Sequence, residues 1–369
     1  MTATTLHQRL PASIPNVPRV PSGARADGEP SLIIVVSPGA SPDDLDHIVA
    51  RVEETGRQAH LSVGTERSII GVIGSDDPSL QDIFEALPFV ESVHRVTKPY
   101  KLVSREFRPE NTVVEVGQGV TVGGVELAVM AGPCSIENED HIFESARAVK
   151  AAGANMLRGG AYKPRSSPYA FRGLGPEGLA YLAAAGQETS LPVITELMTI
   201  RDIDTVCRYT DVIQIGARNM QNFILLDEVG KVKKPVMLKR AMSGQIEEWL
   251  LAAEYILAQG NPNVILCERG IRTFETAYRN VMDVTCIPVL KRETHLPVIV
   301  DPSHAGGKTW MVPALARAAI AAGADGLLVE MHPNPCEAWC DADQALNPEE
   351  FHALMGSLRG IANVIGRSL

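Results

Sequence analysis

The chain has 369 residues, of which 45 % are hydrophobic and 21 % charged, and its formal net charge at pH 7 is −10. This length predicts one large and one small domain, because a typical domain holds roughly 100–200 residues and a parallel α/β barrel about 250. The acidic balance argues against a nucleic-acid partner, which needs a basic surface. A membrane span is not expected either, since no apolar run approaches the roughly 18 residues it needs.

Residues 1–30 are rich in Pro, Ser, Ala and Gly without sustained periodicity, and they predict a flexible tail. From residue 31 to residue 104, short apolar runs alternate with helical spacing. The predicted elements are a strand at 32–36, a helix at 43–55, strands at 60–63 and 68–73, a helix at 80–87 and a strand at 90–96. This β-α-β-β-α-β order is that of a small ferredoxin-like α+β domain. It contains no catalytic constellation.

Residues 105–369 show a recurring pattern. A short apolar strand ends in charged or reactive residues and is followed by a helix. A glycine-rich segment at 113–129 predicts a hairpin in front of the first repeat. The expected strands are 127–134, 155–159, 192–197, 212–217, 235–239, 264–268, 297–300 and 326–330. The clearest helical stretches are 139–152, 177–188, 245–258, 309–322 and 348–365.

Eight strands alternating with helices predict an α/β fold of the (β/α)8 TIM barrel type. A doubly wound open sheet is the competing architecture. The barrel is preferred because reactive residues stand at the C-terminal ends of all eight strands, whereas an open sheet concentrates them at one switch point.

The residues at these strand ends form one predicted site, because the carboxyl ends of barrel strands meet at one mouth. They are Cys134, Arg158, Lys163, Arg165, Glu196, Arg218, Lys239, Glu268, Arg269, Asp301, His304, Glu330 and His332. A ring of Lys and Arg in one cup is costly without anions to neutralise it. The pattern therefore predicts a ligand with several phosphate or carboxylate groups, although any one of these residues could equally be an ordinary surface charge.

A divalent metal site is a second possibility at the same mouth. Cys134, His304, Glu330 and Asp341 offer a thiolate, an imidazole and two carboxylates. Such mixed ligation suits Mn, Fe, Co or Zn without choosing among them. Taken singly, a buried Cys is usually a small hydrophobe and a His a satisfied core residue, so the shared strand-end placement carries this interpretation.

Several long motifs make the chain similar to the 3-deoxy-7-phosphoheptulonate (DAHP) synthases. They are AGPCS at 131–135, LRGGAYKPRSSP at 157–168, IGARN at 215–219, LKR at 238–240, CERG at 267–270, DPSH at 301–304, VEMHP at 329–333 and CDADQ at 340–344. The resemblance runs from about residue 32 to the C-terminus. It is closest to the short type I form, in which an N-terminal ferredoxin-like domain is regulatory.

The resemblance implies a role for each matched residue. It makes Cys134, His304, Glu330 and Asp341 the metal ligands. The residues that it assigns to substrates are Arg158, Lys163 and Lys239 for phosphoenolpyruvate, Ala217, Arg218, Glu268 and Arg269 around its phosphate, Arg165 and Ser166 for the phosphate of erythrose 4-phosphate, and Asp301 near the aldehyde of that sugar. Lys163, His304 and Asp301 would be catalytic. Lys163 is expected to transfer a proton, because a Lys among cations has a lowered pKa.

The implied reaction is a metal-dependent condensation of phosphoenolpyruvate, erythrose 4-phosphate and water to DAHP and phosphate, the first step of the shikimate pathway. The nearest alternative is the sister enzyme that makes 3-deoxy-octulosonate 8-phosphate from arabinose 5-phosphate. The motif KPRS at 163–166 resembles the four-carbon-sugar version of the loop. An alternative of another class is a non-catalytic effector-binding protein.

The resemblance also implies feedback inhibition and a homotetramer. His60 and Ser62 match positions that contact an aromatic amino acid in the regulatory subgroup, with tyrosine the first candidate and phenylalanine the second. The small domain would then close over the barrel mouth when the effector binds. The alternative is that both side chains simply face solvent, since His-x-Ser is a short and common pattern.

Six cysteines in a chain without a secretion signal predict free thiols or ligands, and the cytoplasm is the expected location. Cys336 and Cys340 depart from the family pattern, because the family usually has no cysteine pair beside this metal ligand. They could compete for the ion or oxidise, but harmless buried thiols are the preferred interpretation.

Overall fold

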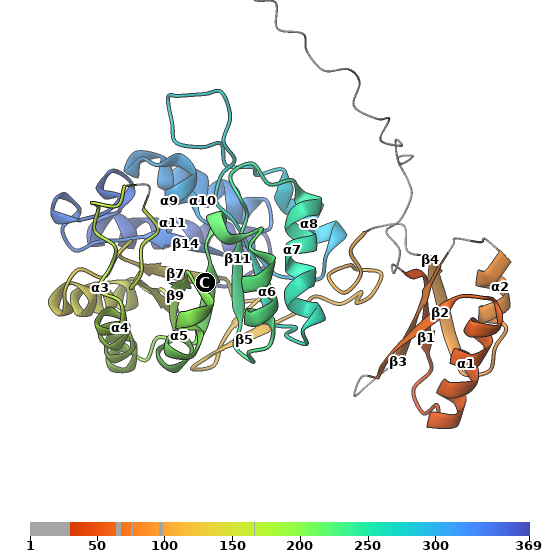
Figure 1. Ribbon diagram of the computed structural model, residues 1–369. Helices are drawn as coiled ribbons and strands as arrows, with labels where there is room; N and C mark the ends of the chain where they lie inside the picture. Colours follow the sequence, from red (N-terminus) through yellow and green to blue (C-terminus); the bar gives the residue numbers. More distant parts are fainter. Residues whose placement is uncertain (1–29, 64–67, 75–76, 78, 96–98, 166) are drawn as a thin grey trace, which may run out of the picture. The chain divides into compact units, whose positions relative to one another are not determined.

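The computed structural model describes residues 30–63, 68–74, 77, 79–95, 99–165 and 167–369 (Figure 1). The tail predicted at 1–30 lies outside the described residues except for Pro30. The chain divides into two compact units, of which one ends at Thr97 and the other begins at Lys98. The boundary expected near residue 104 therefore lies inside the second unit.

The small unit is a four-stranded antiparallel sheet with two helices, and its ferredoxin-like fold is confirmed. Its elements are β1 Pro30–Val36, α1 Pro42–Glu54, β2 Gln58–Val63, β3 Ser68–Ile73, α2 Ser79–Glu85 and β4 Val90–Arg95. The sheet order is β2-β3-β1-β4. Helix α1 begins where Ser41 and Asp44 form a reciprocal capping box and Pro42 occupies the first turn.

The core of the small unit is apolar and lies between the sheet and both helices. Alternate residues of β1, namely Leu32, Ile34 and Val36, are fully buried, as period-2 side-chain alternation requires. They join Ile48 of α1 and Phe84 of α2 in one hydrophobic cluster. The two helices therefore cover the same face of the sheet.

The large unit is a closed barrel of eight parallel strands. They are β7 Ala128–Gly132, β8 Met156–Arg158, β9 Val193–Leu197, β10 Val212–Ile215, β11 Val236–Lys239, β12 Val264–Glu268, β13 Val298–Val300 and β14 Gly326–Glu330. Each strand pairs in parallel with the next, and β14 pairs with β7. This closure confirms the TIM barrel and excludes the open sheet.

Helices surround the barrel (Figure 1). They are α3 Glu139–Ala152, α4 Pro176–Thr189, α5 Ile203–Tyr209, α6 Phe223–Gly230, α7 Ile246–Ala258, α8 Cys286–Glu293, α9 Pro302–Gly306, α10 Val312–Ala321 and α11 Pro348–Val364. The stretch predicted as one helix at 309–322 begins instead with a 3₁₀ turn, Thr309–Met311, before α10. Within the described residues, no helix is both long and apolar enough to span a membrane.

One end of the barrel is covered by the hairpin β5 Val114–Gly117 and β6 Val120–Val122. Val114, Val116 and Val122 belong to the same buried cluster as side chains at the strand starts, such as Ala128 and Met156. The hairpin thus closes the N-terminal end of the barrel. The C-terminal end, where TIM-barrel sites are built, stays available for polar side chains.

Candidate active site at the barrel mouth

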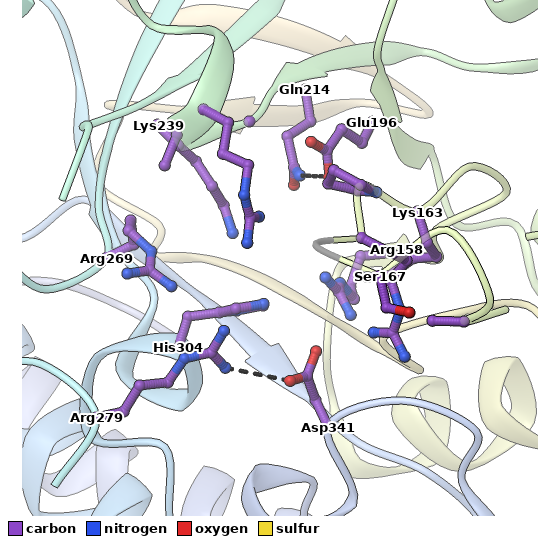
Figure 2. A pocket seen from close by; sticks show the side chains of 16 residues that line it. Arg158, Lys163, Ser167, Glu196, Gln214, Lys239, Arg269, Arg279, His304 and Asp341 are labelled. Atoms are coloured by element: carbon purple, nitrogen blue, oxygen red, sulfur yellow. Dashed lines mark hydrogen bonds and ion pairs between the residues drawn. The ribbon is translucent and has the colours of Figure 1, made fainter. Parts of the chain in front are cut away.

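The strand ends and the loops that follow them line one pocket of about 330 Å³ (Figure 2). Its cationic lining residues are Arg158, Lys163, Arg165, Arg218, Lys239, Arg269 and Arg279, and its acidic ones are Glu196 and Asp341. Pro164, Ser167, Ala170, Gln214, Gly216, Ala217 and His304 complete the lining. The structure therefore brings together most of the residues predicted from the strand ends.

Three of the four buried cations that line this pocket differ in how their charge is balanced. Arg158 lies 3.2 Å from a Glu330 oxygen, and Lys239 lies 2.5 Å from an Asp301 oxygen. Arg269 is 5 % exposed, and its Nη1 is one of the few buried side-chain nitrogens without a hydrogen-bond partner among the described residues. Burial lowers the pKa of Arg269, although nearby carboxylates oppose this effect. A buried, unsatisfied guanidinium is expensive, so the pocket favours an anionic ligand.

Four potential metal ligands meet beside the pocket. One donor atom each from Cys134, His304, Glu330 and Asp341 lies within 4.8 Å of the other three. Cys134 Sγ lies 3.0 Å from Asp341 Oδ2, although the two residues are 207 positions apart. Burial, with Glu330 next in effect, holds the pKa of the Cys134 thiol well above its ordinary value. A cation would replace that proton, because thiols bind metals as thiolates.

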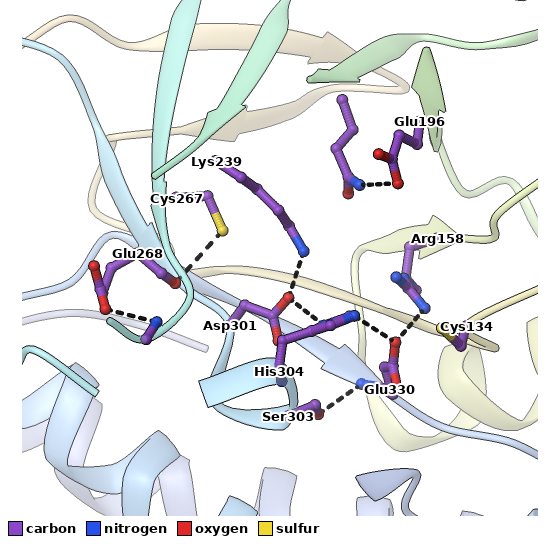
Figure 3. A network of polar contacts seen from close by, with 12 residues as sticks. Cys134, Arg158, Glu196, Lys239, Cys267, Glu268, Asp301, Ser303, His304 and Glu330 are labelled. Atoms are coloured by element: carbon purple, nitrogen blue, oxygen red, sulfur yellow. Dashed lines mark hydrogen bonds and ion pairs between the residues drawn. The ribbon is translucent and has the colours of Figure 1, made fainter. Parts of the chain in front are cut away.

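His304 is oriented by its neighbours in this cluster (Figure 3). Its Nδ1 lies 2.7 Å from Asp301 Oδ2, outside hydrogen-bond geometry, and its Nε2 lies 3.3 Å from Glu330 Oε1. Burial lowers the pKa of His304, which keeps a neutral imidazole available as a ligand. A carboxylate behind the far ring nitrogen is the usual partner of a metal-binding histidine. The donor set therefore fits a divalent ion.

Lys163 contacts the candidate metal ligand Cys134 directly. Its Nζ donates to Cys134 Sγ at 2.9 Å and to the Cys134 carbonyl at 3.0 Å. This approach requires Gly160, because a Cβ there would lie 2.5 Å from the same carbonyl oxygen and 2.9 Å from Lys163 Cδ. The expected lowering of the Lys163 pKa is wrong. Burial does lower it, but Cys134 and Glu330 outweigh burial and Arg158, and the net pKa is raised.

Some predicted site residues lie elsewhere. Glu268 is fully buried, does not line the pocket, and accepts hydrogen bonds from Arg240 Nη1 and from the N–H groups of Gly270 and Asp283. Its carboxylate supports the backbone after β12, so it is a structural neighbour of Arg269 and not a pocket residue. Ser166 lies outside the described residues.

His60 and Ser62 belong to the small unit, on the edge strand β2. They pair with Gly71 and Ile69 of β3. Both are exposed and, two residues apart on a strand, they share one face of the sheet. This exposure suits a surface that binds a ligand as well as one that simply faces solvent.

Gln214 and Arg279 line the pocket but were missed from the sequence. Gln214 donates to Glu196 from the neighbouring strand at 3.3 Å, and the register places the two side by side. Strand alternation could have identified Gln214, since it is a polar residue inside an apolar strand. Arg279 comes from a long loop after β12 and bonds Asp341 at 3.2 Å, a position that no strand-end pattern indicates.

Cys336 and Cys340 are not among the four candidate metal ligands. Cys336 is exposed, Cys340 is buried, and both are free thiols. Neither shares the space enclosed by the four candidate ligands. The interpretation of both as buried thiols is therefore wrong for Cys336 and correct for Cys340.

Comparisons with known proteins agree with this geometry. The profile of the DAHP synthetase I family matches residues 111–363, and that of the DAHP synthase ferredoxin-like domain matches residues 32–98. The chain is 48 % identical over 335 residues to the phospho-2-dehydro-3-deoxyheptonate aldolase of Thermotoga maritima, covering 91 % of this chain and 99 % of that protein.

A solved structure from the same organism, the phospho-2-dehydro-3-deoxyheptonate aldolase (DAHP synthase), matches with a TM-score of 0.72 and 47 % identity. The match covers 91 % of this chain and 98 % of that one. A more distant relative, the 2-dehydro-3-deoxyphosphooctonate aldolase of Syntrophobacter fumaroxidans, is 32 % identical over 266 residues, 67 % of this chain and 91 % of that protein.

Proposed function

The chain belongs to the DAHP synthetase I family and is an enzyme of DAHP synthesis, and we propose that it condenses phosphoenolpyruvate with erythrose 4-phosphate in a metal-dependent reaction. A new carbon–carbon bond joins C3 of phosphoenolpyruvate to the aldehyde carbon, water adds at C2, and inorganic phosphate leaves. The observation that carries the proposal is a pocket lined by seven cationic side chains beside four residues that could bind a metal ion.

The cations offset the repulsion between two anionic substrates. Arg158 and Lys239 are buried and would hold the carboxylate of phosphoenolpyruvate, whereas Arg269 and Arg218 would hold its phosphate together with the Ala217 N–H. In a site shielded from water these interactions are stronger than at the surface. The unsatisfied Nη1 of Arg269 supports its assignment to a phosphate oxygen.

A divalent ion would be held by Cys134, His304, Glu330 and Asp341. When bound, it would supply Lewis-acid chemistry, polarising the sugar aldehyde or activating water. Lys163, whose Nζ lies 2.9 Å from Cys134 Sγ, would deliver a proton to the reacting atoms. Asp301 would keep His304 and Lys239 in place, because its Oδ1 accepts the His304 backbone N–H at 2.9 Å and its Oδ2 lies 2.5 Å from Lys239 Nζ.

The choice of sugar rests on Arg165, which lines the pocket, and on Ser166 beside it in sequence. The octulosonate alternative is less favoured, because the relative of that name is 32 % identical and the heptonate relative is 48 % identical. Phosphate release should be measured with phosphoenolpyruvate and either erythrose 4-phosphate or arabinose 5-phosphate. The proposal requires faster turnover with the four-carbon sugar. Faster turnover with arabinose 5-phosphate would contradict it, and so would the absence of turnover with either sugar.

The small unit is the proposed sensor for tyrosine or phenylalanine, through the exposed face of β2 that carries His60 and Ser62. An effector can inhibit only if it binds the active and inactive states with different affinity. The catalytic residues of the proposed mechanism belong to the barrel unit, so the effector would bind one unit and change turnover in the other. A homotetramer is proposed from the family resemblance.

A further inference from the structure

A second cluster of ionisable side chains, Glu137, His141 and His332, lies next to the proposed metal site, and one donor atom of each is within 4.8 Å of the others. Glu137 is 4 % exposed and His332 is 2 % exposed. The proposed mechanism uses none of the three. Two chemical roles fit such a cluster, a second cation site or a hydrogen-bonded brace.

The hydrogen bonds of His332 decide between these roles. Its Nδ1 accepts the backbone N–H of Asn334 at 3.0 Å, and a backbone N–H can only donate. The proton of the neutral ring is therefore on Nε2, which points at Glu137 Oε2 at 3.3 Å. A metal-binding histidine shows the reverse arrangement, with the far nitrogen donating. The Glu137–His332 pair is thus arranged as a hydrogen-bonded brace and not as a pair of metal ligands.

Glu137 connects the two loops that carry the proposed ligands. It lies three residues after Cys134, in the β7–α3 loop. Its Oε1 accepts the N–H of Trp339 at 2.6 Å, two residues before Asp341, and its Oε2 accepts from His332, two residues after Glu330. One buried carboxylate therefore contacts the backbone two residues before Asp341 and the side chain two residues after Glu330, and it stands three residues after Cys134.

Asp341 needs such support because its backbone is strained. It has φ 51° and ψ 35°, in the left-handed region that residues with a Cβ adopt much less often than glycine. Such a conformation persists only when its surroundings fix it. Glu137 anchors the chain just before Asp341, and just after it Gln344 donates to Glu330 at 2.7 Å.

The anchored segment also contacts the substrate loop. The rings of Trp339 and Phe171 meet edge to face with centroids 4.8 Å apart. Phe171 follows Lys163 and Arg165 in the same loop. Movement of residue 339 would therefore disturb both the ligand loop and the loop that lines the pocket.

We propose that Glu137 is a positioning residue that presets the metal site by locking the loop of Asp341 onto the loop of Cys134. This inference rests on the metal site of the proposed function. Replacing Glu137 by Gln keeps the size of the side chain but replaces one of its two acceptor oxygens with an NH2 group. That group, which can only donate, would face the N–H of Trp339 or of His332. Loss of a supporting partner of this kind typically weakens metal binding about 10- to 100-fold.

The test is a titration of the metal-stripped full chain with Co²⁺. Binding is measured as the thiolate-to-cobalt charge-transfer absorption. We expect Glu137→Gln to raise the Kd for Co²⁺ about 10- to 100-fold. The matched control is Glu139→Gln, the same change on an exposed side chain two residues further on, for which the Kd should stay at the wild-type value. An equal Kd for Glu137→Gln and wild type would overturn the proposal.

Two further variants distinguish failure of the proposed metal site from failure of the role proposed for Glu137. Cys134→Ser should abolish the absorption; a wild-type chain without the absorption would contradict the metal site itself, and this inference with it. If Glu137→Gln is recovered unfolded, His332→Asn replaces it, because it leaves the Trp339 contact intact. A Kd raised about tenfold would support the brace, and an unchanged Kd would refute it.

Discussion

The two units of this chain bury different kinds of side chain. Within the described residues, the small unit buries apolar groups and Ser31 but no charged side chain, whereas the barrel buries Arg158, Lys239, Glu330 and other charged groups. Burying charge is costly and is tolerated only where partners or ligands compensate it. The difference locates the chemistry in the barrel mouth and leaves only the surface of the small unit for binding.

The largest effect on kcat should come from replacing a candidate metal ligand. Cys134→Ser replaces a thiolate with a poor ligand and should lower kcat about 100-fold or more, because an ion contributes several kcal/mol to the transition state. Cys207→Ser, the same change at a half-buried thiol outside the pocket, should retain activity. The measurement is kcat together with thermal unfolding, which should show a folded barrel. A wild-type kcat in Cys134→Ser would contradict the assignment of the chemistry to the metal ligands of the barrel unit.

The sugar-phosphate contact should give the next largest effect. Arg165→Ala removes a charge-assisted contact, for which about 1.5–3 kcal/mol is typical, or roughly 10- to 150-fold in binding. The KM for erythrose 4-phosphate should rise by this factor and the KM for phosphoenolpyruvate far less. Arg201→Ala, at an exposed residue away from the pocket, is the control. Equal increases in both KM values would refute the assignment.

The small unit should change the response to an effector. A coupling of about 1–3 kcal/mol corresponds to roughly 5- to 150-fold inhibition. Replacing His60 and Ser62 together by Ala should bring the ratio of rates without and with tyrosine or phenylalanine close to one. The ratio should stay at the wild-type value in His94→Ala, a histidine on β4. A wild-type chain that ignores every aromatic amino acid would remove the sensor role.

The core of the small unit should affect basal turnover least. Phe84→Ala empties a fully buried site and should destabilise this unit by about 3–5 kcal/mol. Phe89→Ala, the same change at a 48 % exposed side chain, should cost far less. Differential scanning calorimetry should show an early transition for Phe84→Ala, while kcat without effector stays within about twofold because the unit has its own core. A large fall in kcat would show that the units depend on each other.

Sequence reasoning identified the barrel and its mouth because reactive residues mark strand ends. Arg158 and Lys239, which line the pocket, and Glu330, which pairs with Arg158, were expected there from the sequence. It did not identify α5, α6 or α8, which are short and lack a long helical repeat. Arg279 was missed because a long loop brings it to Asp341.

The direction of the Lys163 pKa was predicted wrongly for a related reason. The sequence shows that cations surround Lys163, but not that its Nζ lies 2.9 Å from Cys134 Sγ. Close pairing depends on distances that only the folded loops determine. The same limit applies to Glu268, whose carboxylate turns toward Arg240 and away from the pocket.

The central claim is that the mouth works as a metal-dependent site, and metal removal tests it most directly. The full chain should be stripped with a chelator, dialysed, and assayed for phosphate release from phosphoenolpyruvate and erythrose 4-phosphate before and after addition of Mn²⁺ or Co²⁺. The account predicts a rate at least about 100-fold lower in the stripped enzyme and recovery when the ion is restored. An unchanged rate in enzyme shown by elemental analysis to be free of metal would contradict it.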